Sequence, residues 1–175
     1  MRGVRGFTLW ELLCALGVAG VLVGLGAPAL TDFLLDGRRT ADVNGLVLAV
    51  QLARNEAAKR GRPVIVCPTA DRIRCGGAFG TGFMVYVNLD DQYPPARNGD
   101  EPLLYAHTPE IAGTITSNRP YYEFRVGRRS TNGTVVFCDR RGTAAARAVI
   151  VSYTARPRIA ARDADGRPLQ CAWAT

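Results

Sequence analysis

The segment that most constrains this chain is a run of twenty residues, Leu12 to Thr31, without a charged side chain. At about 1.5 Å per residue, a helix of that length spans roughly 30 Å, the thickness of a bilayer's hydrocarbon core. Arg2 and Arg5 precede the run and no acid accompanies them. The positive-inside rule then places the N-terminus in the cytoplasm. The sequence therefore predicts one membrane-spanning helix.

A carboxylate, Glu11, stands at the entrance of the apolar run. At the bilayer centre a charge costs roughly 2.5–3.5 kcal/mol even on the most favourable insertion scale, so such a residue indicates a function and a partner. A cut between Gly6 and Phe7 would create a cationic α-amine at Phe7. In an assembly, the amine of one subunit could neutralise Glu11 of the next.

The stretch Gly6-Phe7-Thr8-Leu9-Trp10-Glu11 resembles the start of type IV pilins and pseudopilins, where a short basic leader ends in glycine. The resemblance implies that residues 1–6 are a leader removed by a prepilin peptidase, which also N-methylates Phe7. It implies a single-pass protein of the bacterial inner membrane, with a periplasmic C-terminal head. Other pilin or pseudopilin subunits are then its partners, and assembly into a filament runs through the helix.

An ordinary signal peptide is the competing interpretation, because Ala27-Pro28-Ala29 mimics a small-residue cleavage site. Glu11 interrupts its apolar region, a proline lies inside the tripeptide, and helical patterning continues beyond it. A plain membrane anchor is compatible with the pilin interpretation. Pro28 removes a backbone donor, so we expect it to bend or open the helix.

Residues 36–60 predict an amphipathic continuation of the assembly helix at 7–35. Its apolar positions recur at steps of three and four: Val43, Leu46, Val47, Val50, Ala53 and Ala57. Asp42 near its beginning would suit the helix dipole. Gly61 and Pro63 end it.

Residues 61–175 predict a β-rich head. We expect strands at 64–67, 83–88, 103–107, 111–116, 121–126, 134–138 and 148–153. Asn132-Gly133 predicts a hairpin between the fifth and sixth of them. Strands that follow one helix in a run imply an antiparallel sheet packed on that helix, which is an α+β fold.

Five cysteines divide into two groups. Cys14 lies in the apolar helix and is expected to behave as a small buried hydrophobe. The other four, in an oxidising compartment, suggest two disulfides with three possible pairings. Cys67–Cys75 would close a short loop and Cys138–Cys171 would tie down the C-terminal tail, so we favour this pairing. The rival metal site lacks paired Cys-x-x-Cys spacing and a second histidine, so no metal or other cofactor is expected.

An acidic loop offers oxygen ligands of the kind that bind calcium. Its members are Asn88, Asp90, Asp91, Asp100 and Glu101. The spacing does not match an EF-hand, and such loops are usually only solvated.

The C-terminal third is rich in arginine: residues 119–167 hold eleven arginines against four acids. The net charge is +7 and Lys59 is the one lysine, so the arginine bias weakens any argument from charge alone. Pro157 favours an extended segment in which Arg156 and Arg158 point to the same side. Paired guanidinium groups suit phosphates. The alternative is a solvated arginine face.

A narrower resemblance rests on Cys67-Pro68, Cys75, the stretch 137–142 and the stretch 147–158. These resemble the FimT/GspH group of minor pilins. Members of the FimT type bind DNA during natural transformation through a Gly-Arg-x-Arg stretch, in which Ala155 here replaces the glycine. The resemblance implies a DNA-binding role for Arg156 and Arg158. The arginine-rich C-terminal third adds Arg128, Arg129 and Arg162 as candidate DNA-binding residues. Members of the GspH type are pseudopilins of type II secretion and imply no DNA.

Two functions therefore stay open: a structural minor subunit of a type IV pilus or secretion pseudopilus, or the same scaffold as a DNA-binding module. An enzyme is disfavoured because no nucleophile–base pair, phosphate-binding glycine loop or metal ligand set is visible, and no catalytic residue is predicted.

Overall fold

The computed structural model describes residues 8–171, except for the side chains of residues 25–28. Gly6 and Phe7 lie outside this range. The chain divides into two compact units after Gly37. One helix, α1 (Leu9–Arg60), runs through the division.

By its length and composition, α1 could cross a membrane. Its large apolar side chains from Leu9 to Val23 are exposed in the single chain. Cys14 is exposed as well, so the expectation that it is buried is wrong for the isolated chain. The helix continues without a break through Pro28, and a bend there stays a prediction.

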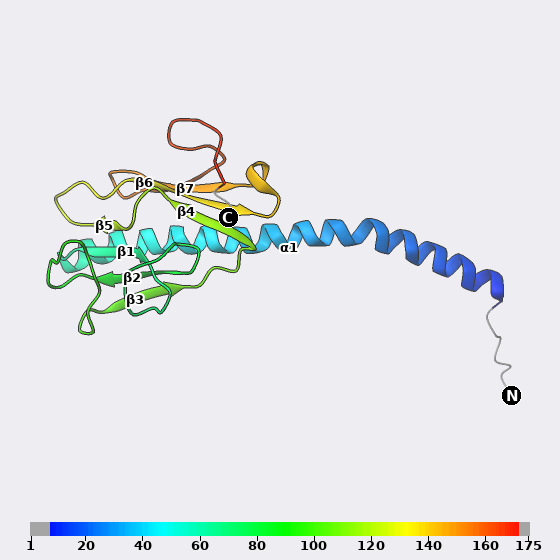
Figure 1. Ribbon diagram of the computed structural model, residues 1–175, viewed down its shortest axis with the longest axis horizontal. Coiled ribbons are helices and arrows are strands. Elements are labelled where there is room, and N and C mark those ends of the chain that lie inside the picture. Colours follow the sequence, from blue (N-terminus) through cyan, green and yellow to red (C-terminus); the bar gives the residue numbers. More distant parts are fainter. Residues whose placement is uncertain (1–7, 172–175) are drawn as a thin grey trace. The chain divides into compact units, whose positions relative to one another are not determined.

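The head contains eight strands that form two antiparallel sheets (Figure 1). Sheet A has the order β3-β2-β1-β5 and sheet B the order β4-β6-β7-β8. The strands are β1 (Val64–Pro68), β2 (Phe83–Val87), β3 (Leu103–His107), β4 (Gly113–Ser117), β5 (Tyr122–Phe124), β6 (Gly133–Asp139), β7 (Arg147–Val151) and β8 (Pro157–Ala160). A 3₁₀ turn, η1 (Gly142–Ala144), links β6 to β7.

A single core joins the head part of α1 to both sheets. The apolar stripe of α1 is buried at Val43, Leu46, Val50 and further turns, as its spacing predicts. It packs against inward-facing residues of both sheets: Val64, Val66, Val85, Phe124, Ile115, Val135, Phe137 and Val149. Each such side chain contributes roughly 1.5–3 kcal/mol when fully buried. In the view of Figure 1 the two sheets flank this part of α1.

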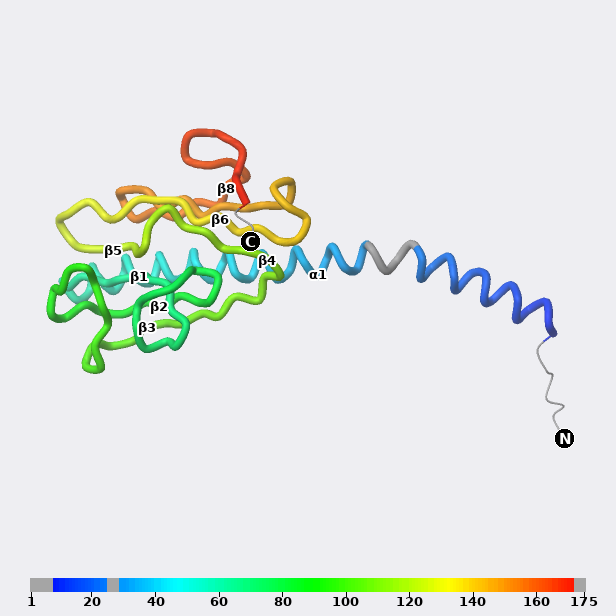
Figure 2. Tube along the Cα trace, viewed as in Figure 1, coloured from blue at the N-terminus to red at the C-terminus, as the bar shows by residue number. Residues whose placement is uncertain are grey.

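The outer face of each sheet has its own cover, fastened by a disulfide. Cys67 of β1 is bonded to Cys75, beside the buried outer residues Met84 and Tyr86 of sheet A. Cys138 of β6 is bonded to Cys171. The tail before it packs over the outer residues of sheet B (Figure 2, orange to red). Burial on both faces explains why β1 and β2 read as continuous apolar runs.

Three details of the predicted head are wrong. There are two sheets where one was expected. β5 pairs with β1 and β6 pairs with β4 and β7, so Asn132-Gly133 closes no hairpin. Gly133 instead lies where the Asn118 side chain comes close to the backbone, because a Cβ at position 133 would lie 2.6 Å from that side chain. β8 was not predicted as a strand, since its arginine and proline obscure the β pattern.

Loss of the Cys138–Cys171 bond should destabilise the head more than loss of Cys67–Cys75. The first closes a separation of 33 residues and the second one of 8. The loop-entropy model gives about 3.7 and about 2.5 kcal/mol respectively. Urea unfolding of the two double Cys→Ala variants, followed by circular dichroism, measures the difference. Cys14→Ala is the control and should leave the midpoint unchanged. A larger loss for the shorter loop would contradict the model.

Candidate functional site

At the start of α1, Thr8 and Glu11 form a capping box. The Glu11 carboxylate accepts hydrogen bonds from the Thr8 N–H and hydroxyl, both at 3.0 Å. The Glu11 N–H donates back to the Thr8 hydroxyl at 3.3 Å. This reciprocal pair satisfies helix-start donors that have no partner within the helix. Glu11 therefore has local donors in the single chain, and its pairing with Phe7 of a neighbour stays a prediction.

The β5–β6 loop and the β7–β8 hairpin bring four of the five predicted DNA-binding arginines into one region of the head. Arg128 and Arg129 lie between β5 and β6, Arg156 lies in the β7–β8 turn, and Arg158 lies in β8. The loops are joined by a hydrogen bond of 3.0 Å from Ser130 N–H to the Tyr153 carbonyl. All four arginine side chains are exposed. The Arg129 guanidinium lies over the Tyr153 ring, 5.7 Å from its centre, a cation–π arrangement.

Arg162 stands apart from this group. It lies beyond β8 in an isolated bridge with Pro168, and its guanidinium donates to the Gly166 carbonyl at 3.0 Å. Its charge therefore supports the C-terminal loop. Arg141 is likewise engaged inside the head, with Asp139.

Ala155 replaces the glycine of the FimT-type stretch, and its backbone adopts a conformation that favours glycine. Its φ is +57°, in the left-handed region. Ala155 N–H donates to the Ser152 carbonyl at 2.9 Å, and Ser152 N–H to the Arg156 carbonyl at 3.2 Å. This is the three-residue hairpin loop that ends in a left-handed residue. The strain, about 1–2 kcal/mol, is partly offset because the Ala155 methyl group is buried in the core.

A buried ionic cluster between α1 and sheet B is absent from the predictions made from the sequence. Asp139, at the end of β6, is fully buried and its carboxylate lies 3.4 Å from Arg39 Nη1 and 2.7 Å from Arg141 Nη2. The Arg141 guanidinium lowers the pKa of Asp139 despite burial, which acts in the opposite direction. Arg39 also donates to the Ala145 carbonyl. The sequence signal that could have predicted this cluster is Arg39, which lies four residues before Val43 on the apolar stripe of α1.

Asp42 is the second buried polar residue of that stripe. Its carboxylate accepts hydrogen bonds from Ile111 N–H at 2.8 Å and Glu110 N–H at 3.1 Å, and His107 Nε2 lies 2.8 Å away. The expectation that Asp42 serves the start of a helix is wrong, because α1 begins at Leu9. Asp42 instead holds the β3–β4 connection onto α1.

The carboxylates of the acidic loop are engaged in contacts within the head. Glu101 is buried and accepts from Leu89 N–H at 2.7 Å and Asn98 N–H at 3.0 Å. Asp91 forms an ion pair of 2.8 Å with Arg125. Within residues 8–171, no three His, Cys, Asp or Glu side chains gather as a metal-binding group.

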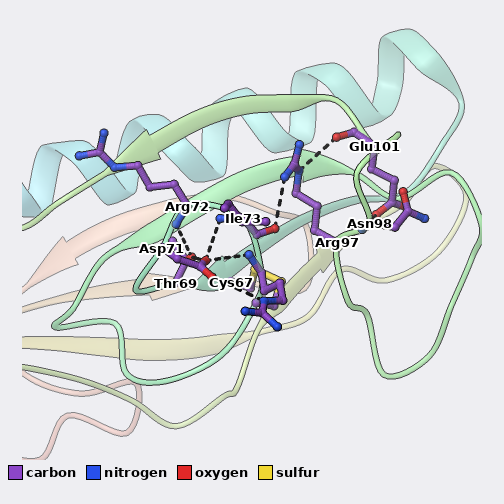
Figure 3. Close-up of a disulfide and its surroundings, with 10 residues drawn as sticks. Cys67, Thr69, Asp71, Arg72, Ile73, Arg97, Asn98 and Glu101 are labelled. Carbon is purple, nitrogen blue, oxygen red and sulfur yellow. Dashed lines mark hydrogen bonds and ion pairs between the residues drawn. A yellow bond between two sulfur atoms is a disulfide. The ribbon is translucent and has the colours of Figure 1, made fainter.

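The loop closed by Cys67–Cys75 is ordered by a single carboxylate (Figure 3). Asp71 Oδ1 accepts hydrogen bonds from Arg74 N–H at 2.9 Å and Ile73 N–H at 2.8 Å. These backbone donors lower the pKa of Asp71 to about 2. Arg97 from the next loop donates to the Ile73 carbonyl at 3.2 Å. The disulfide loop is therefore fixed to its neighbour.

Comparison with known proteins identifies the family. The model of the type II transport protein GspH matches residues 42–154, more than half of the chain. The chain therefore belongs to the GspH family, and the expected membership of the GspH/FimT group of minor pilins is confirmed. The match ends just before Ala155, so Arg156 and Arg158 lie outside it. No curated protein matches the chain.

Two solved structures support the fold. Both are crystal forms of the type IV minor pilin FimU of Pseudomonas aeruginosa strain PAO1. One has a TM-score of 0.55 at 17% identity, covering 75% of this chain and 98% of FimU. The other has 0.52 at 19% identity, covering 76% and 94%. They confirm the predicted pilin-like α+β fold, a long helix packed on antiparallel sheets.

Replacing Asp139 by Asn should destabilise the head by about 3–5 kcal/mol at neutral pH, because it removes the buried negative charge that Arg39 and Arg141 both contact. The folded-state pKa of Asp139 is lowered, so its stabilisation is present above the unfolded-state pKa. It is lost as the pH falls through the folded-state value. The difference between wild type and Asp139→Asn in urea unfolding should therefore shrink below about pH 4.

The control for this prediction is Arg140→Ala, which removes an exposed neighbouring charge and should change stability by less than about 0.5 kcal/mol. A pH-independent difference for Asp139→Asn would show that the cluster does not act through its charge.

Proposed function

We propose that the chain is a minor subunit of a type IV filament, either a pilus or the pseudopilus of a type II secretion system. A prepilin peptidase removes residues 1–6 and N-methylates Phe7. The mature chain waits in the inner membrane with its N-terminus in the cytoplasm and its head in the periplasm. It then joins other subunits through α1, in a structural rather than enzymatic role.

The observation that carries this proposal is the presence, in one chain, of a capped helix with a long uncharged run and a head of the GspH family. The capping box begins at Thr8, immediately after the predicted new terminus at Phe7. The helix exposes large side chains, including Trp10, Leu13 and Leu16, that a single soluble chain would bury. Such a surface requires lipid or neighbouring helices. Both are available to a subunit that moves from a membrane into a filament.

Mass spectrometry of the protein recovered from its native envelope should show N-methylated Phe7 as the first residue. A retained Met1, or a cut near residue 29, would overturn the proposal. Glu11→Gln separates processing from assembly, because it removes the charge that pairs with the neighbour's amine. This variant should be cleaved normally but be depleted from sheared filaments. If cleavage and the amount in sheared filaments fell equally, a folding defect would be the explanation instead.

DNA binding is the second candidate function, and the paired loops favour it. Arg128 and Arg129 are exposed on the β5–β6 loop, and Arg156 and Arg158 are exposed on the β7–β8 hairpin. A backbone hydrogen bond joins the two. Within the described residues none of the four forms an ion pair with an acid. Four uncompensated guanidinium groups in one region can contact several phosphates, an interaction that depends on charge and not on base sequence.

Gel-shift titration of the detergent-solubilised mature chain tests this function at low salt. Arg156→Ala with Arg158→Ala should weaken binding to double-stranded DNA of any sequence. It should also lower the slope of log affinity against log salt by about 2. The matched control is Arg140→Ala with Arg167→Ala, which removes the same charge from exposed positions outside the candidate DNA-binding set. Equal binding by wild type and the first variant, or none by either, rejects the DNA role.

A further inference from the structure

A hollow of about 250 Å³ lies where the end of α1 meets the β5–β6 and β7–β8 loops. Its lining combines an apolar floor with arginines. Phe124, Ala57 and Ala155 are buried there, at 1%, 2% and 4% exposure. Val126 and Tyr153 line it too, and both are more than half exposed.

Three arginines line the hollow, and their charges are not equivalent. Arg125 is already paired, with Glu123 at 2.7 Å and with Asp91 at 2.8 Å. Arg54 of α1 and Arg128 of the β5–β6 loop have no hydrogen bond or ion pair with any residue of the described chain. The hollow therefore carries two uncompensated positive charges beside an apolar surface.

The chemistry of the lining specifies what would fill it. A guanidinium group binds a carboxylate with two parallel hydrogen bonds, and this pairing is strongest where water is excluded. The floor needs an apolar side chain to remove it from water. The volume equals that of about eight water molecules, which is small for a cofactor but large enough for one or two side chains. Arginine and tyrosine around a desolvated centre are typical of protein–protein contacts.

We propose that this hollow, defined by Arg54, Arg128, Phe124 and Tyr153, is a docking site for an acidic segment of another protein subunit. The segment places an apolar side chain on the Phe124 floor and a carboxylate within reach of Arg54 and Arg128. The inference rests on the proposed role as a filament subunit, which supplies protein neighbours. The hollow shares Arg128 with the four candidate DNA-binding arginines, but Arg156 and Arg158 do not line it.

A pair of model peptides tests the docking site. The probes are fluorescein-labelled Gly-Ser-Gly-Leu-Glu-Phe-Gly-Ser and the same peptide with Gln in place of Glu. They are titrated to millimolar concentration against the mature full chain in detergent micelles, with fluorescence anisotropy as the readout. The Glu peptide should bind about tenfold more tightly than the Gln peptide, because a charge-assisted hydrogen bond is lost in the second.

Arg54→Gln with Arg128→Gln should abolish that preference for the Glu peptide. A second variant, Ala58→Phe, fills the hollow from an exposed position without removing any charge and should weaken both peptides. The matched control is Arg156→Gln with Arg158→Gln, which removes the same charge and should keep the preference.

Four outcomes would overturn the proposal: no binding of either peptide, equal binding of both, an unchanged preference in Arg54→Gln with Arg128→Gln, or an equal loss in the control. Displacement of the Glu peptide by an equimolar single-stranded oligonucleotide would reassign the hollow to nucleic acid. These results are independent of filament assembly. A chain that is processed and found in filaments but fails here would lose only the docking site.

Discussion

The head depends on the burial of one stripe of α1 against the inner faces of two sheets. Val43, Leu46 and Val50 belong to one buried cluster with residues of both sheets, so neither sheet can complete its core without the helix. The head part of α1 is thus the centre of the folded head.

Two buried polar contacts fix where the sheets sit along that stripe. Apolar packing alone is not directional, and it would tolerate a shift of one helical turn at modest cost. Asp42 accepts backbone donors from the β3–β4 connection, and Arg39 reaches Asp139 at the end of β6. A displaced register would leave a buried charge or N–H group without its partner, which costs more than a lost apolar contact. These residues therefore specify one arrangement.

The disulfides hold segments of the chain over the outer faces of both sheets. Each sheet has an outer face that a domain of this size would normally expose to water. Cys67–Cys75 and Cys138–Cys171 hold a loop and a tail over these faces, which become buried. The edges and loops that this loop and tail do not cover remain available for contacts. The β5–β6 and β7–β8 loops, with their arginines, form one such free region.

Much of this protein's architecture could be predicted from its sequence, because it depends on local chemistry. The uncharged run, the apolar stripe and the isolated carboxylate predicted a long helix with a membrane half and a head half. Loop lengths favoured the cysteine pairing that the structure contains. These features depend on residues close in sequence, or on the spacing of one residue type.

Only the tertiary structure decided which strands pair and which charges meet. The split into two sheets, the role of Gly133 as a close approach, and the strand β8 all depend on neighbours from distant segments. The same holds for the arginines, because Arg141 is used by Asp139 while Arg54 joins Arg128 at the hollow. A charge acquires its function from the groups around it in space. The sequence therefore shows which charges exist, and the fold determines which of them remain free.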